Sequence, residues 1–544
     1  MKLNWTAVFT IVDDTEEKDT SNSMYTGRST MLNLFVVAAF LCWTANGFIA
    51  PPNKCQGNCS PFSKHLGSEK SSTDSIITQP SLFDKQTQGV VKPGSAENLL
   101  FKCDESVAFW RAFDSQGNDG NLRRMWEILS VKFVDGSTKS RAYWSSQVLR
   151  TGYFTFNAAL GSMASDIHER FIGGRNKNSE PAESVSVHTS PVLSAQNGGM
   201  SSRILNSEIP TRLLLEASKT FEQDWEAVDK GLIKFPWDAI VQSKGESVNL
   251  QWDHQQANPF FVASATGRTI LESIGTLSRR YKLMGKPSEI WVNKNDDPIG
   301  ATGLYPSYYL NDFHYQTDGW FSTESANRYE TLTETLFLGR QDAMQRQTLI
   351  PLKNHFVEKV PKNILEIACG TGRLATFTRD NYPTTDIMLT DLSPFYLEKA
   401  RKNDEYWRSY RGKAAMKEVG LSGEPRPASF LQANCESLPI PDNSFDAVIC
   451  VYLFHELPSE ARARAATEMV RIVRPGGIVV LTDSVQLGDR PPMDSSLTAF
   501  SNLNEPYYEN YVKCNLPELF QGLECSEKFV SSSTKTLSFK KPIQ

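Results

Sequence analysis

One ten-residue stretch, Ile364 to Arg373, restricts the possible folds more than any other part of the chain. It begins with an apolar run interrupted by Glu366, which is typical of a strand buried on both faces of a parallel sheet. A Cys-Gly-Thr-Gly turn follows, in which Gly370 and Gly372 permit positive φ and a close approach of backbone to ligand. The segment 373–380 has the pattern of a helix, so strand, turn and helix N-terminus together predict a cofactor pocket.

The glycine turn alone does not identify the ligand. The spacing Gly370-x-Gly372-x-x-Ala375 also fits the dinucleotide fingerprint, so a nicotinamide-dependent oxidoreductase is one interpretation. The next predicted strand ends on Asp391, where a carboxylate can accept hydrogen bonds from both ribose hydroxyls of an adenosine. The alternative for Asp391 is a role in starting the next helix, because Ser393 and the proline after it have the form of an N-cap and first helical residue.

Apolar runs and helical patterns alternate through the last third of the chain. The predicted strands are 364–368, 386–390, 428–433, 447–452 and 478–482. Helices are predicted between them, and those with the clearest ends are 394–403 and 459–472, the latter capped by Ser459. Two further segments, 523–530 and 534–540, can pair as a terminal antiparallel hairpin. This order predicts an α/β fold with a doubly wound, mostly parallel seven-stranded sheet and right-handed crossovers.

Length and composition allow more than one domain. With 544 residues and 40% apolar residues, the chain can build two or three domains with sizeable cores. We expect four parts: a targeting leader and disordered segment at 1–97, a mostly helical region at 98–290 with a flexible insertion at 173–208, a connector and lid helix at 291–350, and a cofactor-binding domain at 351–544.

The segment from Tyr308 to Trp320 concentrates aromatic and polar side chains just ahead of the predicted sheet. One helix is predicted after it, at 323–348, in a position from which it can close over a cofactor pocket. His314, Tyr315, Trp320 and Tyr329 are therefore candidates for a lid or a substrate wall. The alternative is ordinary packing between domains.

The first hundred residues have the composition of a targeting leader. Leu34 to Ala45 is an apolar run of twelve residues, too short for a membrane-spanning helix but suited to the core of a signal peptide. Ala45 and Gly47 form a cleavage site before Phe48, and Ser/Thr/Gln-rich sequence follows. This arrangement resembles the bipartite leaders of algae with secondary plastids, so we expect a plastid location, with the secretory pathway as the alternative. No integral span is expected in the mature chain, whereas peripheral membrane contact stays open.

Charge and cysteine usage argue against two classes of partner. The net charge of -5 and pI near 5.9 give no basic surplus, so nucleic acid is not the expected partner. The nine cysteines are scattered, and the pair Cys55 and Cys59 has no second pair or histidine ladder to complete a zinc site. Cys369, Cys435 and Cys450 fall in or beside predicted strands, where a thiol behaves as a small buried apolar group.

Four motifs occur in a fixed order. They are Glu366-x-x-Cys-Gly-Thr-Gly, Leu-Thr-Asp391-Leu-Ser-Pro, Leu-Pro-Ile-Pro-Asp442-Asn-Ser-Phe-Asp and Val-Arg-Pro-Gly-Gly477. In this order and spacing they resemble the class I S-adenosylmethionine-dependent methyltransferases, and within them the type-11 subgroup that includes ubiquinone and menaquinone biosynthesis enzymes. The resemblance covers about 364–539, and the run 308–541 is also similar to cyanobacterial and plastid members.

This resemblance implies S-adenosyl-L-methionine as the cofactor and assigns residues to its parts. Glu366, Ala368, Gly370 and Gly372 would hold the methionyl portion. Asp391 would hold the ribose, and Asn434 with Cys435 the adenine edge. Further cofactor-binding candidates beside them are Cys369, Thr371, Leu392 and Glu436. Asn434 replaces an acidic residue, but its carbonyl can still contact the adenine amino group. Tyr452 would lie near the sulfonium, and Tyr329 would cover the site.

The resemblance also implies methyl transfer to a small-molecule acceptor, such as a lipid, quinone or pigment precursor. His455, just past the fourth strand, is the candidate to take a proton from the acceptor, the alternative being a hydrogen bond that fixes its loop. Asp483, at the end of the fifth strand, is the second candidate catalytic residue. A non-catalytic cofactor-binding module is the main alternative function. An oxidoreductase would leave the Pro-Asp-Asn-Ser-Phe-Asp turn unexplained.

Overall fold

The computed structural model of the chain describes residues 105–115, 129, 131–133, 136–172, 209–254, 257–283, 305–497 and 504–543. All of them belong to the larger of the two units into which the chain divides, 48–544. The predicted leader before residue 98, the insertion at 173–208 and the cysteines at 55 and 59 lie outside the described residues. Among the described helices, none is both long and apolar enough to cross a membrane.

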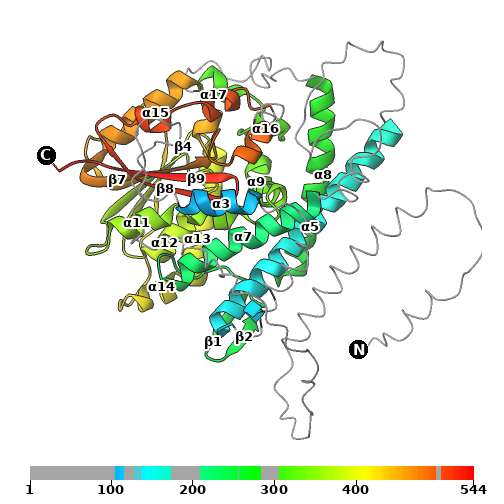
Figure 1. Cartoon of the computed structure of the whole chain (residues 1–544), viewed down its shortest axis with the longest axis horizontal. Coiled ribbons are helices and arrows are strands. Elements are labelled where there is room, and N and C mark those ends of the chain that lie inside the picture. The colour runs from blue at the N-terminus through cyan, green and yellow to red at the C-terminus, as the bar shows by residue number, and fades with distance from the viewer. Residues whose placement is uncertain are drawn as a thin grey trace, which may run out of the picture. The chain divides into compact units, whose positions relative to one another are not determined.

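A seven-stranded sheet organises the second half of the described chain (Figure 1). Its strands are β3 (Asn363–Ile367), β4 (Asp386–Asp391), β5 (Ser429–Gln432), β6 (Phe445–Val451), β7 (Val473–Ser484), β8 (Glu524–Ser531) and β9 (Thr534–Lys540). Their order is β5-β4-β3-β6-β7-β9-β8, and every pair is parallel except those that involve β9. The predicted doubly wound sheet and the terminal hairpin are confirmed.

The strand order reverses at β3. The chain proceeds from β3 to β4 and β5 on one side, and then returns to pair β6 with the other side of β3. Ile367, the last residue of β3, pairs with both Thr390 of β4 and Cys450 of β6. In open α/β sheets, ligands bind beyond the carboxyl ends of the strands at such a switch point. The glycine turn after β3 lies at this position.

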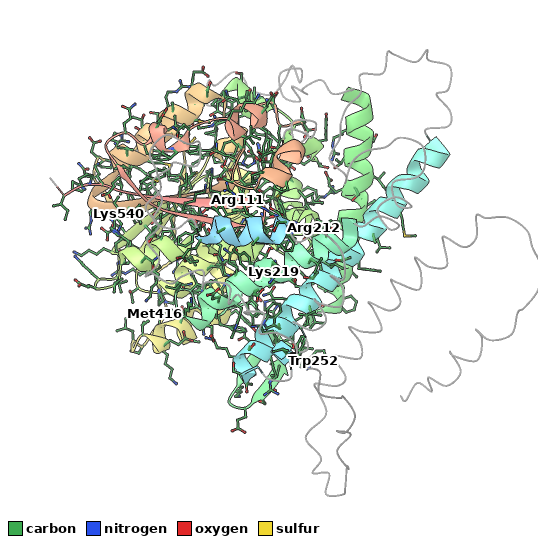
Figure 2. The ribbon with its side chains drawn as sticks, viewed as in Figure 1. Arg111, Arg212, Lys219, Trp252, Met416 and Lys540 are labelled. Carbon is green, nitrogen blue, oxygen red and sulfur yellow. The ribbon has the colours of Figure 1, made fainter. Side chains whose placement is uncertain are left out.

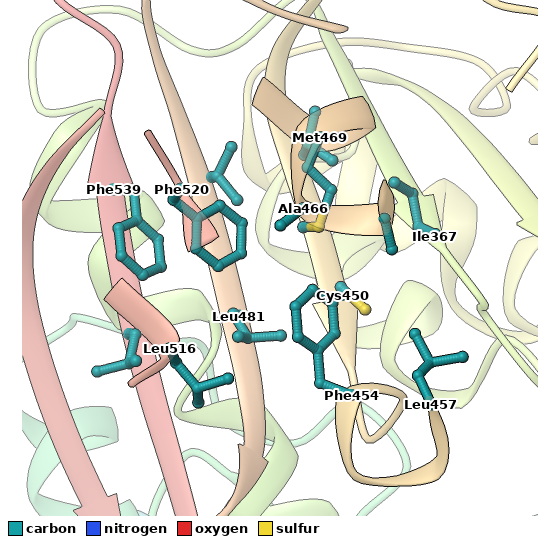
Figure 3. Packing of buried hydrophobic residues seen from close by; sticks show 14 of the residues in the cluster. Ile367, Cys450, Phe454, Leu457, Ala466, Met469, Leu481, Leu516, Phe520 and Phe539 are labelled. Carbon is teal, nitrogen blue, oxygen red and sulfur yellow. The ribbon is translucent and has the colours of Figure 1, made fainter. Parts of the chain in front are cut away.

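Alternate side chains of the strands enter two cores, one on each face. Ile367 and Cys450 belong to the core under α15 (Ser459–Ile472), α17 (Tyr508–Val512) and α18 (Leu516–Leu519), as Figure 3 shows with Phe454 and Phe520 packed nearby. Ile364 belongs to the opposite core under α11 (Leu349–His355), α12 (Arg373–Asn381) and α13 (Pro394–Trp407). The predicted burial of Cys369, Cys435 and Cys450 as free thiols is confirmed.

The first half of the described chain is mostly helical, as predicted. Its helices are α3 (Glu105–Ser115), α5 (Thr138–Ile172), α7 (Ile209–Asp229) and α8 (Pro259–Leu283). The short hairpin of β1 (Val241–Lys244) and β2 (Ser247–Leu250) was not predicted, because neither strand has the apolar alternation of a core strand.

Helix α3 covers the edge of the sheet. The Trp110 Nε1–H donates to the carbonyl of Val530 in β8 at 3.1 Å, and the Val530 N–H donates to Ser106 Oγ at 2.9 Å. Figure 1 shows α3 beside β8 and β9. An edge strand with unpaired backbone groups invites pairing with other chains, and α3 supplies partners to part of this edge.

Helix α7 holds α3 in place from the outside. The Arg212 guanidinium lies 4.0 Å from the centroid of the Phe113 ring, and Lys219 Nζ lies 5.5 Å from that of Phe109. Figure 2 shows Arg212 and Lys219 on α7 near α3. Cations over aromatic faces are attracted by the ring quadrupole, so these contacts add to the apolar packing.

The predicted single helix at 323–348 is wrong. The structure has α9 (Thr323–Leu336), α10 (Gln341–Arg346) and then α11, with a break at Leu338 and Gly339, whose φ angles are 51° and 84°. Leu336, the last residue of α9, is 52% exposed. Left-handed backbone at two consecutive residues ends a helix regardless of its side-chain pattern.

The predicted boundaries of two other elements also need correction. β7 begins at Val473 rather than Ile478, since Val473 pairs with Phe445 and an irregular register accommodates the Pro-Gly-Gly sequence between them. The helix α15 starts at Ser459, with Pro458 at the N-cap position and no side-chain cap, so Ser459 is its first residue and not its cap.

Candidate active site

The turn after β3 is left-handed at three residues, Ala368, Gly370 and Gly372, with φ of 52°, 54° and 69°. The two glycines serve different purposes. A Cβ on Gly372 would come within 2.9 Å of the Ala400 Cβ, so this glycine lets α12 approach α13 closely. A Cβ on Gly370 would meet no atom within 4 Å, so this glycine faces open space. Gly370 therefore leaves room for a ligand at the end of β3.

Asp391, at the end of β4, is bonded to the glycine turn. Its Oδ2 accepts the Gly370 N–H at 2.8 Å, and its Oδ1 accepts the Ser393 N–H at 2.8 Å. Burial raises the pKa of Asp391 to about 6, although these two N–H groups oppose the shift. Ser393 is the N-cap of α13, because its Oγ accepts the Tyr396 N–H. The helix-start role therefore belongs to Ser393, and Asp391 lies at the turn.

Glu366, inside β3, carries a buried oxygen without a partner. Its side chain is 3% exposed, and Oε2 has no hydrogen-bond partner among the described residues. Burial, with the nearby charge of Asp391, raises the pKa of Glu366 to about 8. A buried carboxyl oxygen without a partner is unfavourable by about 1–3 kcal/mol, more when charged. A ligand with a positively charged donor would satisfy it.

The turn after β5 lies beside Asp391. The Ala433 N–H donates to the Asp391 carbonyl at 3.1 Å, which brings the turn with Asn434 and Cys435 next to Asp391. Asn434 Oδ1 accepts the N–H of Glu436 at 3.0 Å, so the amide closes the turn as well as being a candidate ligand contact. The Glu436 carboxylate is itself engaged, by the Tyr308 hydroxyl at 2.6 Å.

The remaining predicted residues of the turn region are buried around it. Leu392 is 8% exposed, and Thr371 is 3% exposed, with its carbonyl accepting a hydrogen bond from Asn403 Nδ2 at 2.9 Å. Cys369 is also buried, and its N–H donates to the Thr390 carbonyl at 2.9 Å. These three residues fix the shape of the turn.

Tyr329 of α9 packs against two further aromatic side chains, Trp320 before that helix and Tyr396 of α13. The Tyr329 ring lies 5.6 Å from that of Tyr396 and 5.8 Å from that of Trp320. Burial raises the pKa of the Tyr329 phenol well above its ordinary value, and the nearby Glu456 and Tyr452 add to the shift. Tyr329 and Trp320 thus lie together at the site, as the lid interpretation requires.

The other two residues of the predicted lid take different positions. Tyr315 is buried, and its carbonyl accepts a hydrogen bond from Arg279 Nε at 2.5 Å, which fits the packing alternative. His314 lies between two carboxylates, with Nδ1 3.1 Å from Glu505 Oε1 and Nε2 3.6 Å from Glu456 Oε1. His314 thus lies beside Glu456, the residue that follows the predicted catalytic His455.

Tyr452 follows β6 with a φ of 54° and lies on the inner side of the site. Its hydroxyl is 2.6 Å from Thr534 Oγ1, and its N–H donates to the Thr482 carbonyl at 2.8 Å. These bonds to β9 and β7 orient the ring, which lies 6.5 Å from the His455 ring.

The two predicted catalytic residues are bonded to each other. His455 Nδ1 lies 2.6 Å from Asp483 Oδ1, while Asp483 Oδ2 accepts the Phe454 N–H at 2.7 Å. Burial opposes the charged imidazole, but Asp483 raises the pKa of His455 to about 9. The dyad fixes the loop after β6 and also leaves His455 Nε2 directed away from Asp483, so the two interpretations of His455 are compatible.

Two residues of this region were missed by sequence reasoning. Glu456 follows His455 directly, so the His-Glu pair was the sequence signal for it. Glu505 lies in a segment without motif or periodicity, and only the fold brings it next to His314.

Comparisons with known proteins agree with this geometry. Residues 365–481 match the type-11 family model described as a methyltransferase domain. A demethylmenaquinone methyltransferase from Thermus thermophilus is 32% identical over 161 residues, which cover 30% of this chain and 63% of that protein. A ubiquinone/menaquinone biosynthesis C-methyltransferase from Psychromonas ingrahamii is 29% identical over 164 residues, covering 30% and 57%. This chain thus spans less than two thirds of these relatives.

Among solved structures, an O-methyltransferase family protein from Burkholderia thailandensis is similar at 11% identity and a TM-score of 0.35, over 63% of this chain and 87% of that chain. The family match confirms the resemblance that the four motifs indicate. It also assigns the glycine turn to a methyltransferase domain rather than to a dinucleotide-binding domain.

Proposed function

We propose that residues 365–481, which match the type-11 methyltransferase family model, form a class I methyltransferase domain that transfers the methyl group of S-adenosylmethionine to a small-molecule acceptor. One observation supports the proposal most. Glu366 Oε2, which has no hydrogen-bond partner in the part of the chain that the structure describes, belongs to the penultimate residue of β3, and the turn that follows contains Gly370, which faces open space and is bonded to Asp391. This set provides an anion for an ammonium group, room for a ligand chain and a carboxylate for a sugar.

The residues at the turn fit the cofactor portion by portion. Glu366 would accept the amino group of the methionyl portion, whose positive charge favours the ionised carboxylate. Each Asp391 oxygen accepts one backbone N–H and keeps a lone pair for a ribose hydroxyl. The turn at Asn434 and Cys435 would receive the adenine, and Tyr329 would cover the bound molecule.

Bound S-adenosylmethionine supplies an electrophilic methyl group, so the protein has to align an acceptor, exclude water and accept one proton. Trp320, Tyr329 and Tyr396 form an aromatic wall that excludes water. With Nδ1 bonded to Asp483, neutral His455 presents its Nε2 lone pair to the acceptor hydroxyl. Asp483 then stabilises the imidazolium that proton transfer creates.

We further propose a hydroxylated aromatic acceptor, such as a quinone or pigment precursor. The aromatic wall favours a flat apolar molecule, and the dyad favours one with a hydroxyl proton to remove. The names of the relatives, which are quinone methyltransferases, support the same class.

Two measurements test the proposal. Calorimetry with S-adenosylhomocysteine should show binding by the wild type and its loss in Asp391→Asn. Asp386→Asn is the matched control, because Asp386 begins the same strand and is exposed, where it pairs with Arg426. Transfer of tritiated methyl to a pigment and quinone extract should then follow cofactor binding.

The outcomes separate the competing functions. No heat with S-adenosylhomocysteine in the wild type would exclude the methyltransferase. Heat without methyl incorporation into any extract would instead favour a non-catalytic cofactor-binding module.

We also propose import into a plastid, on the basis of the apolar run 34–45 and the Ser/Thr/Gln-rich sequence after Phe48. Residues 1–97 fused to a fluorescent protein should direct it to the plastid of an alga with a secondary plastid. Fluorescence in the secretory pathway alone would contradict this proposal.

A further inference from the structure

A second histidine faces the acceptor region from the segment ahead of α9. His314 lies in the 3-10 turn η4 (Phe313–Tyr315) with a φ of 57°. Its Nδ1 is 3.1 Å from Glu505 Oε1, and its Nε2 is 3.6 Å from Glu456 Oε1. Asn504 Nδ2 donates to the Asp312 carbonyl, which ties the segment that carries Glu505 to this turn. The imidazole is therefore fixed between carboxylates from two separate parts of the chain.

His455 has the same arrangement on the other side of Glu456. Its Nδ1 is 2.6 Å from Asp483 Oδ1, and its Nε2 is 3.8 Å from Glu456 Oε1. The Nε2 atoms of both imidazoles thus face one oxygen of Glu456. The order of charged groups is Asp483, His455, Glu456, His314, Glu505.

The central carboxylate is the most loosely held of the three. The outer contacts, 2.6 and 3.1 Å, are hydrogen-bond distances, whereas those to Glu456, 3.8 and 3.6 Å, exceed the usual range. The Asp483 and Glu505 side chains are 1% and 4% exposed, against 12% for Glu456. An oxygen atom of a ligand could therefore replace that of Glu456 and approach both imidazoles more closely.

We propose that the hydroxyl oxygen of the acceptor takes the place of Glu456 Oε1 between His314 and His455, which makes His314 a second catalytic residue. This inference rests on the proposed methyl transfer. His455 Nε2 receives the hydroxyl proton, and the O–H electron pair stays on the acceptor, where the His314 Nε2–H donates to the oxyanion. The acceptor then forms a bond to the methyl carbon, while the electron pair of the broken C–S bond stays on sulfur.

The neighbours of the two histidines divide the two roles. Burial opposes a charge on both imidazoles, but Glu505 and Glu456 raise the pKa of His314 to about 10, and Asp483 raises that of His455 to about 9. His314 lies between two carboxylates, which suits the cation, whereas His455 has its Nδ1 bonded to Asp483 and its Nε2 free of that bond, which suits the base. A base and a cation that face the same point suit a phenolic or enolic hydroxyl, whereas a cationic amine would be repelled by His314.

Binding of 4-nitrophenol to protein saturated with S-adenosylhomocysteine tests the arrangement, because the anion absorbs visible light and the phenol does not. The wild type should bind the anion, and Glu456→Gln should bind it about tenfold more tightly, since the resident carboxylate is removed. His314→Gln should bind it roughly 10–100-fold more weakly, as expected for a lost charged hydrogen bond. His355→Gln is the matched control, because His355 ends α11 and bonds to the Gly476 carbonyl of β7, apart from the His314 and His455 cluster.

Glu505→Gln keeps the size of the side chain and leaves His314 in place. It should therefore lower the affinity for the 4-nitrophenolate anion less than His314→Gln does. Anion affinity unchanged in His314→Gln, or lowered in Glu456→Gln, would overturn the inference. Absence of probe binding in both the wild type and Glu456→Gln would overturn the hydroxyl class of acceptor. A failure to bind S-adenosylhomocysteine, measured separately by calorimetry, would instead refute the proposed methyltransferase itself.

Discussion

His455 Nδ1 lies 2.6 Å from Asp483 Oδ1, although His455 follows β6 and Asp483 lies near the end of β7, 28 positions later in the chain. The bond exists because β6 and β7 are parallel neighbours, so residues at their carboxyl ends meet at the same edge of the sheet. The Phe454 N–H holds the other oxygen of Asp483, which leaves the carboxylate in one orientation.

The pH profile of methyl transfer should report this bond. The groups facing His455 are Asp483, Glu456 and Glu505, and Asp483 is the strongest of those that raise its pKa, to about 9. His455 accepts a proton only when neutral, so kcat/KM should rise with pH up to about 9. Asp483→Asn should lower kcat by roughly 100-fold and move the rise toward the ordinary histidine value of about 6.5. An unchanged profile in Asp483→Asn would remove His455 from the reaction.

Cofactor affinity should depend on the protonation of Glu366. Its pKa is raised to about 8 by burial and Asp391, so below this pH the carboxyl must lose a proton before it can bind an ammonium group. The affinity for S-adenosylhomocysteine should therefore rise roughly tenfold between pH 6.5 and pH 7.5, with release of a proton. Calorimetry in two buffers of different ionisation enthalpy measures both quantities. Glu366→Gln should bind more weakly and lose this dependence, and a dependence kept in that variant would assign it to another group.

Alanine substitutions at the two glycines of the turn should affect different properties, the stability of the fold at Gly372 and the binding of the cofactor at Gly370. Each has positive φ, so alanine costs about 1–2 kcal/mol of backbone strain at either position. Gly372→Ala adds a contact of 2.9 Å with Ala400 and should lower the unfolding temperature more. Gly370→Ala adds a methyl group to open space and should mainly weaken cofactor binding. Thermal unfolding and calorimetry on both variants check this, and equal effects of the two variants on both measurements would contradict it.

Trp110 should contribute strongly to stability although it lies far from the site in sequence. Its side chain is fully buried against the sheet edge and donates to the Val530 carbonyl. Trp110→Ala should lower the free energy of unfolding by about 3–5 kcal/mol, through the cavity and the lost hydrogen bond. Trp252→Ala is the control, because Trp252 is 74% exposed and should change it by less than about 0.5 kcal/mol. Urea unfolding curves of both variants measure the free energy of unfolding. A similar small decrease in both variants would mean that α3 is only loosely attached to the sheet.

The sheet was predictable from the sequence because its strands are short apolar runs with polar or glycine-rich ends, of which β3 and β4 are the clearest. The glycine turn and Asp391 were predictable for the same reason, since strand ends in a parallel sheet share one edge. The break at Gly339 was not, because its left-handed backbone depends on packing against Arg150 and Phe154 of a distant helix.

The acceptor half of the site was less predictable than the cofactor half. His455 and Asp483 could be named one by one, but their bond depends on the register of β6 and β7. Glu505 had no signal, because its role follows from a tertiary contact with a turn far from it in sequence. Motifs report on local backbone chemistry, whereas an acceptor site assembled from separate loops depends on the fold.

The contact between Trp110 and Val530 spans 420 positions of the chain. At ribosomal speeds of about 5–20 residues per second, α3 is synthesised roughly 20–80 seconds before the strand that it covers. During that interval its aromatic side chains have no sheet edge to pack against, which makes them targets for chaperones that bind exposed apolar segments. Strands β8 and β9 therefore complete the burial of a helix that left the ribosome long before them.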